Sequence, residues 1–269
     1  MNKPFHLVAA LSAASLLAAP ATAAPEVRWL FWGEIRSTES LSRNGGKNAK
    51  AELYLRPEVT LRAWGKKADV VAYAIVSALG DQKRISYNNK VEAFLGVEGR
   101  YKISSAVRLK FGARVGTHKE RGTGNSNSAA QLTMDAEIWK VWTPSIVTQR
   151  LPQGSRVVLS GWADLRYPSS LDPADKTNGL AQTALKLALD VTLPKSKIRV
   201  APFAQVKAKM DLKRKTDLNY IEPALGVDLK YGIKDGEITF GVKAAHQRSL
   251  YTLDRYSGGI AYVSWYKRF

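Results

Sequence analysis

The side chains best placed to do chemistry in this sequence are basic residues at alternate positions. Arg108, Lys110 and Arg114 share this spacing, and so do Lys207 and Lys209 further along the chain. Residues two apart point to the same face of a β-strand. Guanidinium and ammonium groups lined up on one face bind and guide anions. Anion binding or anion conduction is therefore the chemistry that these residues predict.

Catalytic arrangements have much less support in the sequence. There is no cysteine, and the chain has three histidines, which excludes a catalytic thiolate and a histidine-rich metal site. His246 and Ser249 could serve a hydrolase, but side chains three apart in a strand face opposite sides. His118 has one acid nearby, Glu120. We expect no enzyme activity, no metal and no cofactor, with a hydrolase kept as the less favoured alternative.

Strands with one apolar and one polar face must position these basic residues. The clearest runs from Lys50 to Ala63, where Leu53, Leu55 and Val59 alternate with charged residues. Period two over this length indicates a β-strand and excludes a helix. The same pattern predicts twelve strands, at 27–37, 49–64, 68–79, 89–103, 106–117, 129–142, 155–167, 180–193, 197–210, 218–231, 236–247 and 255–269.

The connections between these segments alternate in length. Short turns such as 65–67, 104–105, 194–196 and 232–235 alternate with longer polar segments, although 143–154 is long for its place. This layout is typical of a transmembrane β-barrel. Pro57, Pro202 and Pro223 fall inside predicted strands, where each removes a backbone donor. A bulge or a strand end is expected at each of them.

The N-terminal segment has the pattern of a secretory signal peptide. Lys3 is followed by an apolar run from Phe5 to Ala19, and Ala21-Thr22-Ala23 fits a cleavage site. We expect residues 1–23 to be the signal and residues 24–269 to form one domain. The net charge of +18 would suggest nucleic acid in a cytosolic protein. For an exported protein it favours acidic solutes, acidic polysaccharide or lipid phosphate, and we expect no nucleic-acid partner.

The last residues carry a family resemblance. Ala261, Val263, Trp265 and Phe269 resemble the C-terminal signature of Gram-negative outer-membrane β-barrel proteins, from which Lys267 departs. The resemblance implies a location in the outer membrane and insertion by the barrel assembly machinery. The fold expected is an all-β, transmembrane, antiparallel up-and-down barrel of about twelve strands. A soluble periplasmic β-sandwich, with the same alternation of faces, is the alternative.

In a barrel the polar faces of the strands point into the lumen. Basic side chains outnumber acidic ones on that face. If these charges pair across the lumen, they fill it and the barrel is a non-conducting structural protein. If basic groups remain in excess, they line an anion-selective pore. We favour the pore, with these candidate lining residues: Arg56, Arg62, Arg100, Arg108, Lys110, Arg114, Arg156, Arg166, Arg199, Lys207 and Lys209.

The basic lumen also contains aromatic residues such as Tyr54, Phe94 and Trp162. In size, strand number and lumenal charge the chain resembles small twelve-stranded porins for acidic oligosaccharides, of the oligogalacturonate and sialic-acid type. The resemblance implies anionic small solutes or acidic oligosaccharides as partners. An export barrel for an anionic exopolysaccharide would need the same lining. Basic residues in the connections are expected to contact membrane lipid and lipopolysaccharide phosphates.

Overall fold

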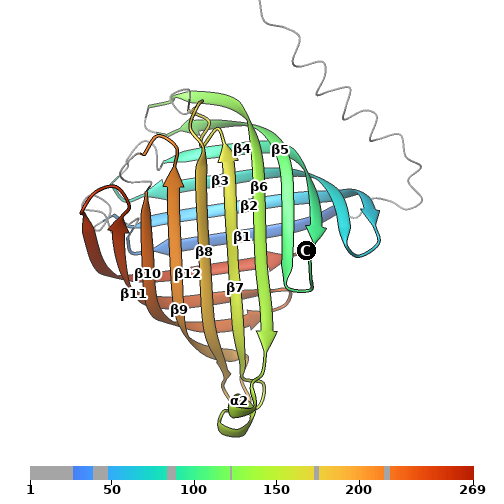
Figure 1. Cartoon of the computed structure of the whole chain (residues 1–269), viewed down its shortest axis with the longest axis vertical. Helices are drawn as coiled ribbons and strands as arrows, with labels where there is room; N and C mark the ends of the chain where they lie inside the picture. Colours follow the sequence, from blue (N-terminus) through green and yellow to red (C-terminus); the bar gives the residue numbers. More distant parts are fainter. Residues whose placement is uncertain (1–26, 39–47, 84–88, 122, 173–175, 215–218) are drawn as a thin grey trace, which may run out of the picture.

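A closed antiparallel barrel of twelve strands forms the body of the protein in the computed structural model. The structure describes residues 27–38, 48–83, 89–121, 123–172, 176–214 and 219–269 (Figure 1). The expected signal peptide lies outside these residues. The strands are β1 (Val27–Arg36), β2 (Lys50–Trp64), β3 (Ala68–Asp81), β4 (Lys90–Lys102), β5 (Val107–Glu120), β6 (Ser126–Trp142), β7 (Arg156–Tyr167), β8 (Leu180–Thr192), β9 (Ile198–Asp211), β10 (Tyr220–Ile233), β11 (Gly236–Ser249) and β12 (Arg255–Arg268).

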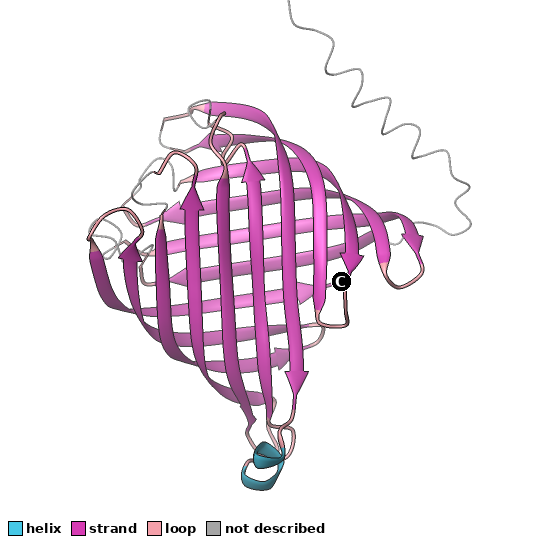
Figure 2. Ribbon diagram, in the orientation of Figure 1, coloured by secondary structure: helices cyan, strands magenta, loops and turns pink. Residues whose placement is uncertain are grey.

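Every strand pairs with its neighbours in sequence, and β1 pairs with β12 to close the barrel. Phe269 completes the closure, because its backbone N–H and C=O both bond Trp29, at 3.0 and 3.1 Å. The long connection after β6 contains the short helix α2 (Ser145–Arg150) at the end of the short turns (Figure 2). Within the described residues, no helix has the length and apolar character of a membrane span.

The faces of the wall are apolar outside and polar inside. Leu95, Leu132, Leu225 and Val242 lie on the outer face and are more than half exposed. Aromatic side chains, including Trp64 and Trp139, are exposed near the ends of the strands by the short turns. The lumenal face instead carries the charged residues. The fold prediction is confirmed, and the sandwich alternative is wrong, because a sandwich would bury the face that is exposed here.

The three strand prolines do not interrupt the register. The partners on either side of Pro57, Pro202 and Pro223 keep the same pairing, although the prolines are unpaired with one neighbouring strand. The predicted bulges or strand ends at the prolines are therefore wrong. The bulge lies at Leu61 instead, where Thr60 pairs with Val71 and Arg62 already pairs with Val70.

The two halves of the barrel repeat one another. Asn48, Asp81 and Asn89 form a bracket in which Asp81 accepts hydrogen bonds from both asparagine amides, each at 2.8 Å. Asn178, Asp211 and Asn219, 130 residues further along, form the same bracket. The spacings of 33 and 8 residues are identical in the two brackets. Strands β1–β6 therefore correspond to β7–β12.

The same correspondence holds within the strands. Trp32, Glu34 and Arg36 on β1 match Trp162, Asp164 and Arg166 on β7, and Leu95–Tyr101 (LGVEGRY) matches Leu225–Tyr231 (LGVDLKY). The Tyr73 ring packs over Gly96, and the Phe203 ring packs over Gly226 in the same way. In both places a Cβ on the glycine would lie 2.6 Å from the ring, too close for a side chain to fit. The repeat therefore extends to the packing of side chains on the lumenal wall.

Candidate functional site

The lumen contains a cavity of about 1850 Å³ that extends from one end of the barrel to the other. Lys66 and Lys67 line it at the short-turn end, and His118 and Ser170 line it at the end of the long connections. A second cavity of about 1190 Å³ lies beside it and shares part of its lining. Among the described residues that line the larger cavity, sixteen are basic and eleven acidic. The lumen is thus hollow, polar and basic.

Ten of the eleven predicted lining residues border these two cavities. Arg62 does not. The bulge at Leu61 reverses the alternation, so Arg62 lies on the outer face, where its guanidinium is 5.3 Å from the centre of the Trp64 ring. Inward placement of Arg62 was wrong, because one extra residue in a strand sends every later side chain to the other face.

The lumenal charges pair along the wall. On β2 and β4, Arg56 binds Glu98 at 2.6 Å, and Arg100 binds both Glu98 and Glu58, at 2.6 and 2.5 Å. The Arg56 guanidinium also stacks on the Tyr73 ring at 4.0 Å. These four charged groups form one network that leaves the centre of the lumen open. Neither sequence-based alternative anticipated pairing between strands two apart.

The second half of the barrel has a matching network. Lys186 binds Asp228 at 2.5 Å and lies 3.7 Å from the centre of the Phe203 ring. Lys230 binds Asp190 at 2.7 Å. Arg199 pairs with Glu237 on β11 and lies 3.8 Å from Asp190. Acids on strands within two positions of each base thus neutralise most of the basic residues on this wall.

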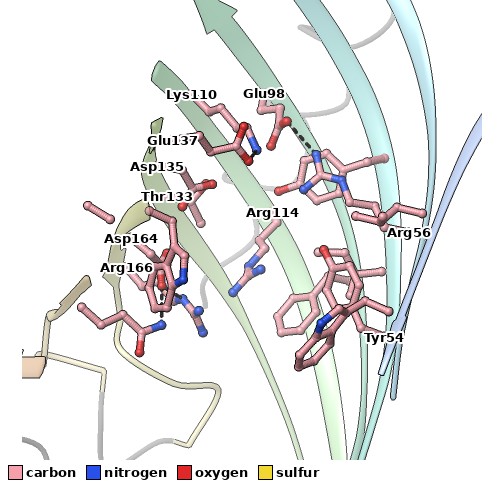
Figure 3. A pocket seen from close by; sticks show the side chains of 18 of the residues that line it. Tyr54, Arg56, Glu98, Lys110, Arg114, Thr133, Asp135, Glu137, Asp164 and Arg166 are labelled. Carbon is pink, nitrogen blue, oxygen red and sulfur yellow. Dashed lines mark hydrogen bonds and ion pairs between the residues drawn. The ribbon is translucent and has the colours of Figure 1, made fainter. Parts of the chain in front are cut away.

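Strand β5 carries three lumenal bases, and only one of them lacks an ion pair among the described residues. Arg108 and Lys110 both pair with Glu137 on β6, the former at 3.9 Å. Arg114 instead donates from Nε to the Gln131 amide oxygen at 2.9 Å and stacks on the Phe94 ring at 4.1 Å. Within the described part of the chain, no ion pair joins Arg114 to a carboxylate. Its guanidinium points into the open space of Figure 3.

The connection after β7 folds into the lumen, which the sequence did not predict. Leu171 is buried against Tyr73, Ile75 and Phe94 on the inner wall. Gln131 donates a hydrogen bond to the backbone oxygen of Pro168 at 2.9 Å and so ties the start of this connection to β6. The lumen is therefore narrowed on one side by a loop that packs on Phe94, the ring on which Arg114 stacks.

The histidines lie in different environments. His118 is buried on the lumenal face of β5. His246 is exposed on the outer face of β11, where Nδ1 lies 2.7 Å from the hydroxyl oxygen of Ser257 on β12. Ser249 is the partner that the sequence offered for His246. Its hydroxyl oxygen accepts hydrogen bonds from the backbone N–H groups of Tyr251 and Thr252 and so stabilises the turn after β11. The described residues contain no cluster of three or more potential metal ligands.

Comparison with known proteins finds similar folds among solved structures only. No family model matches the chain, and no curated protein matches it. The β-domain of the Bordetella autotransporter BrkA is 13% identical, with a TM-score of 0.44 over 92% of this chain and 100% of that one. The translocator domain of NalP from Neisseria meningitidis is 11% identical, with a TM-score of 0.44 over 98% and 97%. An outer-membrane channel from Pseudomonas putida F1 is 9% identical, with a TM-score of 0.43 over 93% and 97%.

Proposed function

We propose that the protein is an outer-membrane channel that passes anionic solutes through its basic lumen. The observation that carries the proposal is the cavity of about 1850 Å³, which is lined from end to end and has more basic than acidic residues among its described lining. Because the ion pairs run along the wall, the charges do not fill the lumen. Excess positive charge in a narrow aqueous passage favours anions over cations.

The outer face of the barrel supports a location in a membrane. Exposed leucine, valine and phenylalanine side chains surround the barrel, a surface that a water-soluble monomer does not display. A closed barrel satisfies all backbone hydrogen bonds without a free edge, as a span through lipid requires. Lys83, Lys119, Arg121, Lys213 and Arg214 at the end of the long connections would then face lipopolysaccharide phosphates.

The direct test is the reversal potential of the purified protein in a planar lipid bilayer under a KCl gradient. We expect discrete channels with a chloride preference, and the preference should fall with rising salt because mobile ions screen the lumenal charge. Potassium preference would contradict the proposal. Absence of conductance at every voltage would favour the structural barrel, in which the inward-folded connection near Leu171 closes the passage.

Acidic oligosaccharides are a class of anionic solute that this lining fits. Arginine side chains bind carboxylates through two parallel hydrogen bonds, and Tyr54, Trp162 and Tyr220 offer ring surfaces beside them. The same lining would serve import of acidic oligosaccharides or export of an anionic polysaccharide, since the direction of transport depends on gradients outside the barrel.

A hydrolase is the second candidate, and it rests on the His246–Ser257 hydrogen bond of 2.7 Å. A serine nucleophile needs a base within this distance. The pair lies on the outer face toward the end of the long connections, where it would meet lipid rather than a lumenal solute. Among the described residues, no hydrogen bond orients the other ring nitrogen of His246, as a catalytic triad requires.

We expect the purified protein to release no fatty acid from phospholipid in mixed detergent micelles, with or without Ca²⁺. The Ser257→Ala variant should conduct as the wild type does, because Ser257 faces away from the lumen. Fatty-acid release by the wild type that disappears in Ser257→Ala, and persists in the Ser249→Ala control, would establish the hydrolase instead.

A further inference from the structure

The internal repeat allows the two halves of the lumenal wall to be compared residue by residue. Their ion pairs correspond, since Arg36 binds Glu34 at 3.3 Å and Arg166 binds Asp164 at 2.6 Å. Cations stack on equivalent rings as well, Arg56 on Tyr73 and Lys186 on Phe203. Because so many contacts correspond, a position where the two halves differ is a candidate for a role that only one half has.

The clearest difference lies on β5 and β11. Arg114 is opposite Gly96 in the β4–β5 pair, and Lys243 is opposite the equivalent Gly226 in the β10–β11 pair. The two basic residues thus occupy the same place in the repeat. Lys243 is neutralised, because Glu222 binds its ammonium group at 3.1 Å.

The acid that could neutralise Arg114 has another partner. Glu92 occupies the place of Glu222 in the first half, and it binds Lys90 at 2.7 Å. In the second half, the place of Lys90 is taken by Tyr220, which leaves Glu222 for Lys243. The different pairing of Arg114 and Lys243 thus goes together with the replacement of a lysine at 90 by a tyrosine at 220.

Arg114 is nevertheless held in place. Phe94, on which its guanidinium stacks, is matched by Ala224 in the second half, and Gln131, which accepts its Nε–H, is matched by Ile260. Gln131 is itself fixed by its hydrogen bond to Pro168. These contacts use the ring face and Nε and leave the two Nη groups of Arg114 directed into the cavity.

Figure 3 shows what surrounds these Nη groups. The Arg114 guanidinium lies between Tyr54 and Arg56 on one side and Asp164 and Arg166 on the other. Asp164 is engaged by Arg166 at 2.6 Å and by the Gln182 amide at 2.8 Å. A carboxylate entering the lumen would therefore find a pair of parallel donors on Arg114, with a phenol ring nearby.

We propose that Arg114 is a binding residue for the carboxylate group of a permeating solute, and that Lys243 is its neutralised counterpart. The proposal rests on the proposed channel function and places one carboxylate site in the half formed by β1–β6. Two parallel N–H···O bonds from a fixed guanidinium bind a planar carboxylate more strongly than they bind chloride, which cannot occupy both donors with the same geometry.

The test compares two charge-matched variants of the full chain, Arg114→Gln and Lys243→Gln, each of which removes one lumenal positive charge. Gluconate is added to the bilayer chamber, and the concentration that halves the chloride current is measured. We expect Arg114→Gln to raise this concentration about tenfold or more, as loss of a charge-assisted hydrogen-bond pair implies. Lys243→Gln should change it about twofold or less, since Glu222 already binds the ammonium group that this variant removes. Arg114→Lys should fall between the two.

Equal loss of gluconate block in Arg114→Gln and Lys243→Gln would overturn the site while leaving the channel intact, because the block would then follow the overall lumenal charge. Titration calorimetry of gluconate into the detergent-solubilised protein supplies a readout that needs no current. If the wild type does not conduct, the proposed channel fails; binding that is lost only in Arg114→Gln would still support the site, and absence of binding would overturn it. Heat-dependent gel mobility checks that each variant is folded.

Discussion

Simultaneous replacement of Arg108, Lys110 and Arg114 by glutamate is expected to reverse the ion preference of the channel, so that potassium passes more readily than chloride. The three side chains lie on the lumenal face of β5 and line the larger cavity. In the variant, glutamates at 108 and 110 would face Glu137 and Asp135 across the β5–β6 pair. The β5–β6 part of the lumenal wall would then carry acids at 108, 110, 135 and 137, and acidic rings select cations.

The matched control replaces three other basic residues by glutamate: Lys195, Lys197 and Lys234. These lie in short turns and border neither cavity. The control changes the net charge by the same amount but places the change outside the conduction path. Mobile ions at about 0.1 M salt screen exposed charges in turns, so the control should keep its chloride preference. The reversal potential under a KCl gradient distinguishes the β5 variant from the control. An unchanged value in the β5 variant would mean that ions do not pass β5.

Most of the architecture could be predicted from the sequence because lipid and water impose a strict period of two on a barrel wall. Leu53, Leu55 and Val59 alternate with charged residues so regularly that β2 was placed to within one residue of its bounds. Ten of the lining residues that the same parity indicated border the two cavities. Arg62 was misplaced because the bulge at Leu61 has no glycine or proline to mark it.

The pairing of the charges was beyond the sequence argument, because it depends on register and on side-chain reach. Arg56 on β2 binds Glu98 on β4, across the intervening strand β3. Arg199 on β9 binds Glu237 on β11 in the same way. Period-two patterns show the face of a residue but not its neighbour across the sheet. The inward fold of Leu171 was missed for a related reason, since a single leucine in a polar connection has no period at all.

The internal repeat is present in the sequence itself, although the period-two pattern of the strands does not reveal it. LGVEGRY and LGVDLKY lie 130 residues apart, and two asparagine–aspartate–asparagine sets share the same spacing. Both are visible as self-similarity at a fixed period of 130 residues, which is the sequence signature of an internal repeat. Positions that differ between the repeats, such as Phe94 and Ala224 beside Arg114, can therefore be identified from the sequence alone.

Replacement of Glu98 by alanine should be the most destabilising single change to the lumenal wall. The Glu98 side chain is 2% exposed and binds Arg56 and Arg100 at 2.6 Å each. Its removal leaves two guanidinium groups facing each other with Glu58 as their remaining acid. We expect a loss of about 3 kcal/mol in the free energy of unfolding, at the lower end for a broken buried ion pair, because Glu58 still binds both arginines.

Urea unfolding of the protein in lipid vesicles, followed by tryptophan fluorescence, measures this loss. Glu34→Ala is the matched control: the Glu34 side chain is 24% exposed, and Arg36 is its one ion-pair partner among the residues that the structure describes, so a loss below about 1 kcal/mol is expected. Asp228→Ala, at the equivalent position of the second half, should cost about as much as Glu98→Ala, since Asp228 binds Lys186 and the Tyr262 hydroxyl. If Glu98→Ala costs no more than Glu34→Ala, then lumenal water solvates the freed arginines fully. The wall would hold its charges without help from the acids, and Arg56 and Arg100 would join Arg114 as groups open to a passing anion.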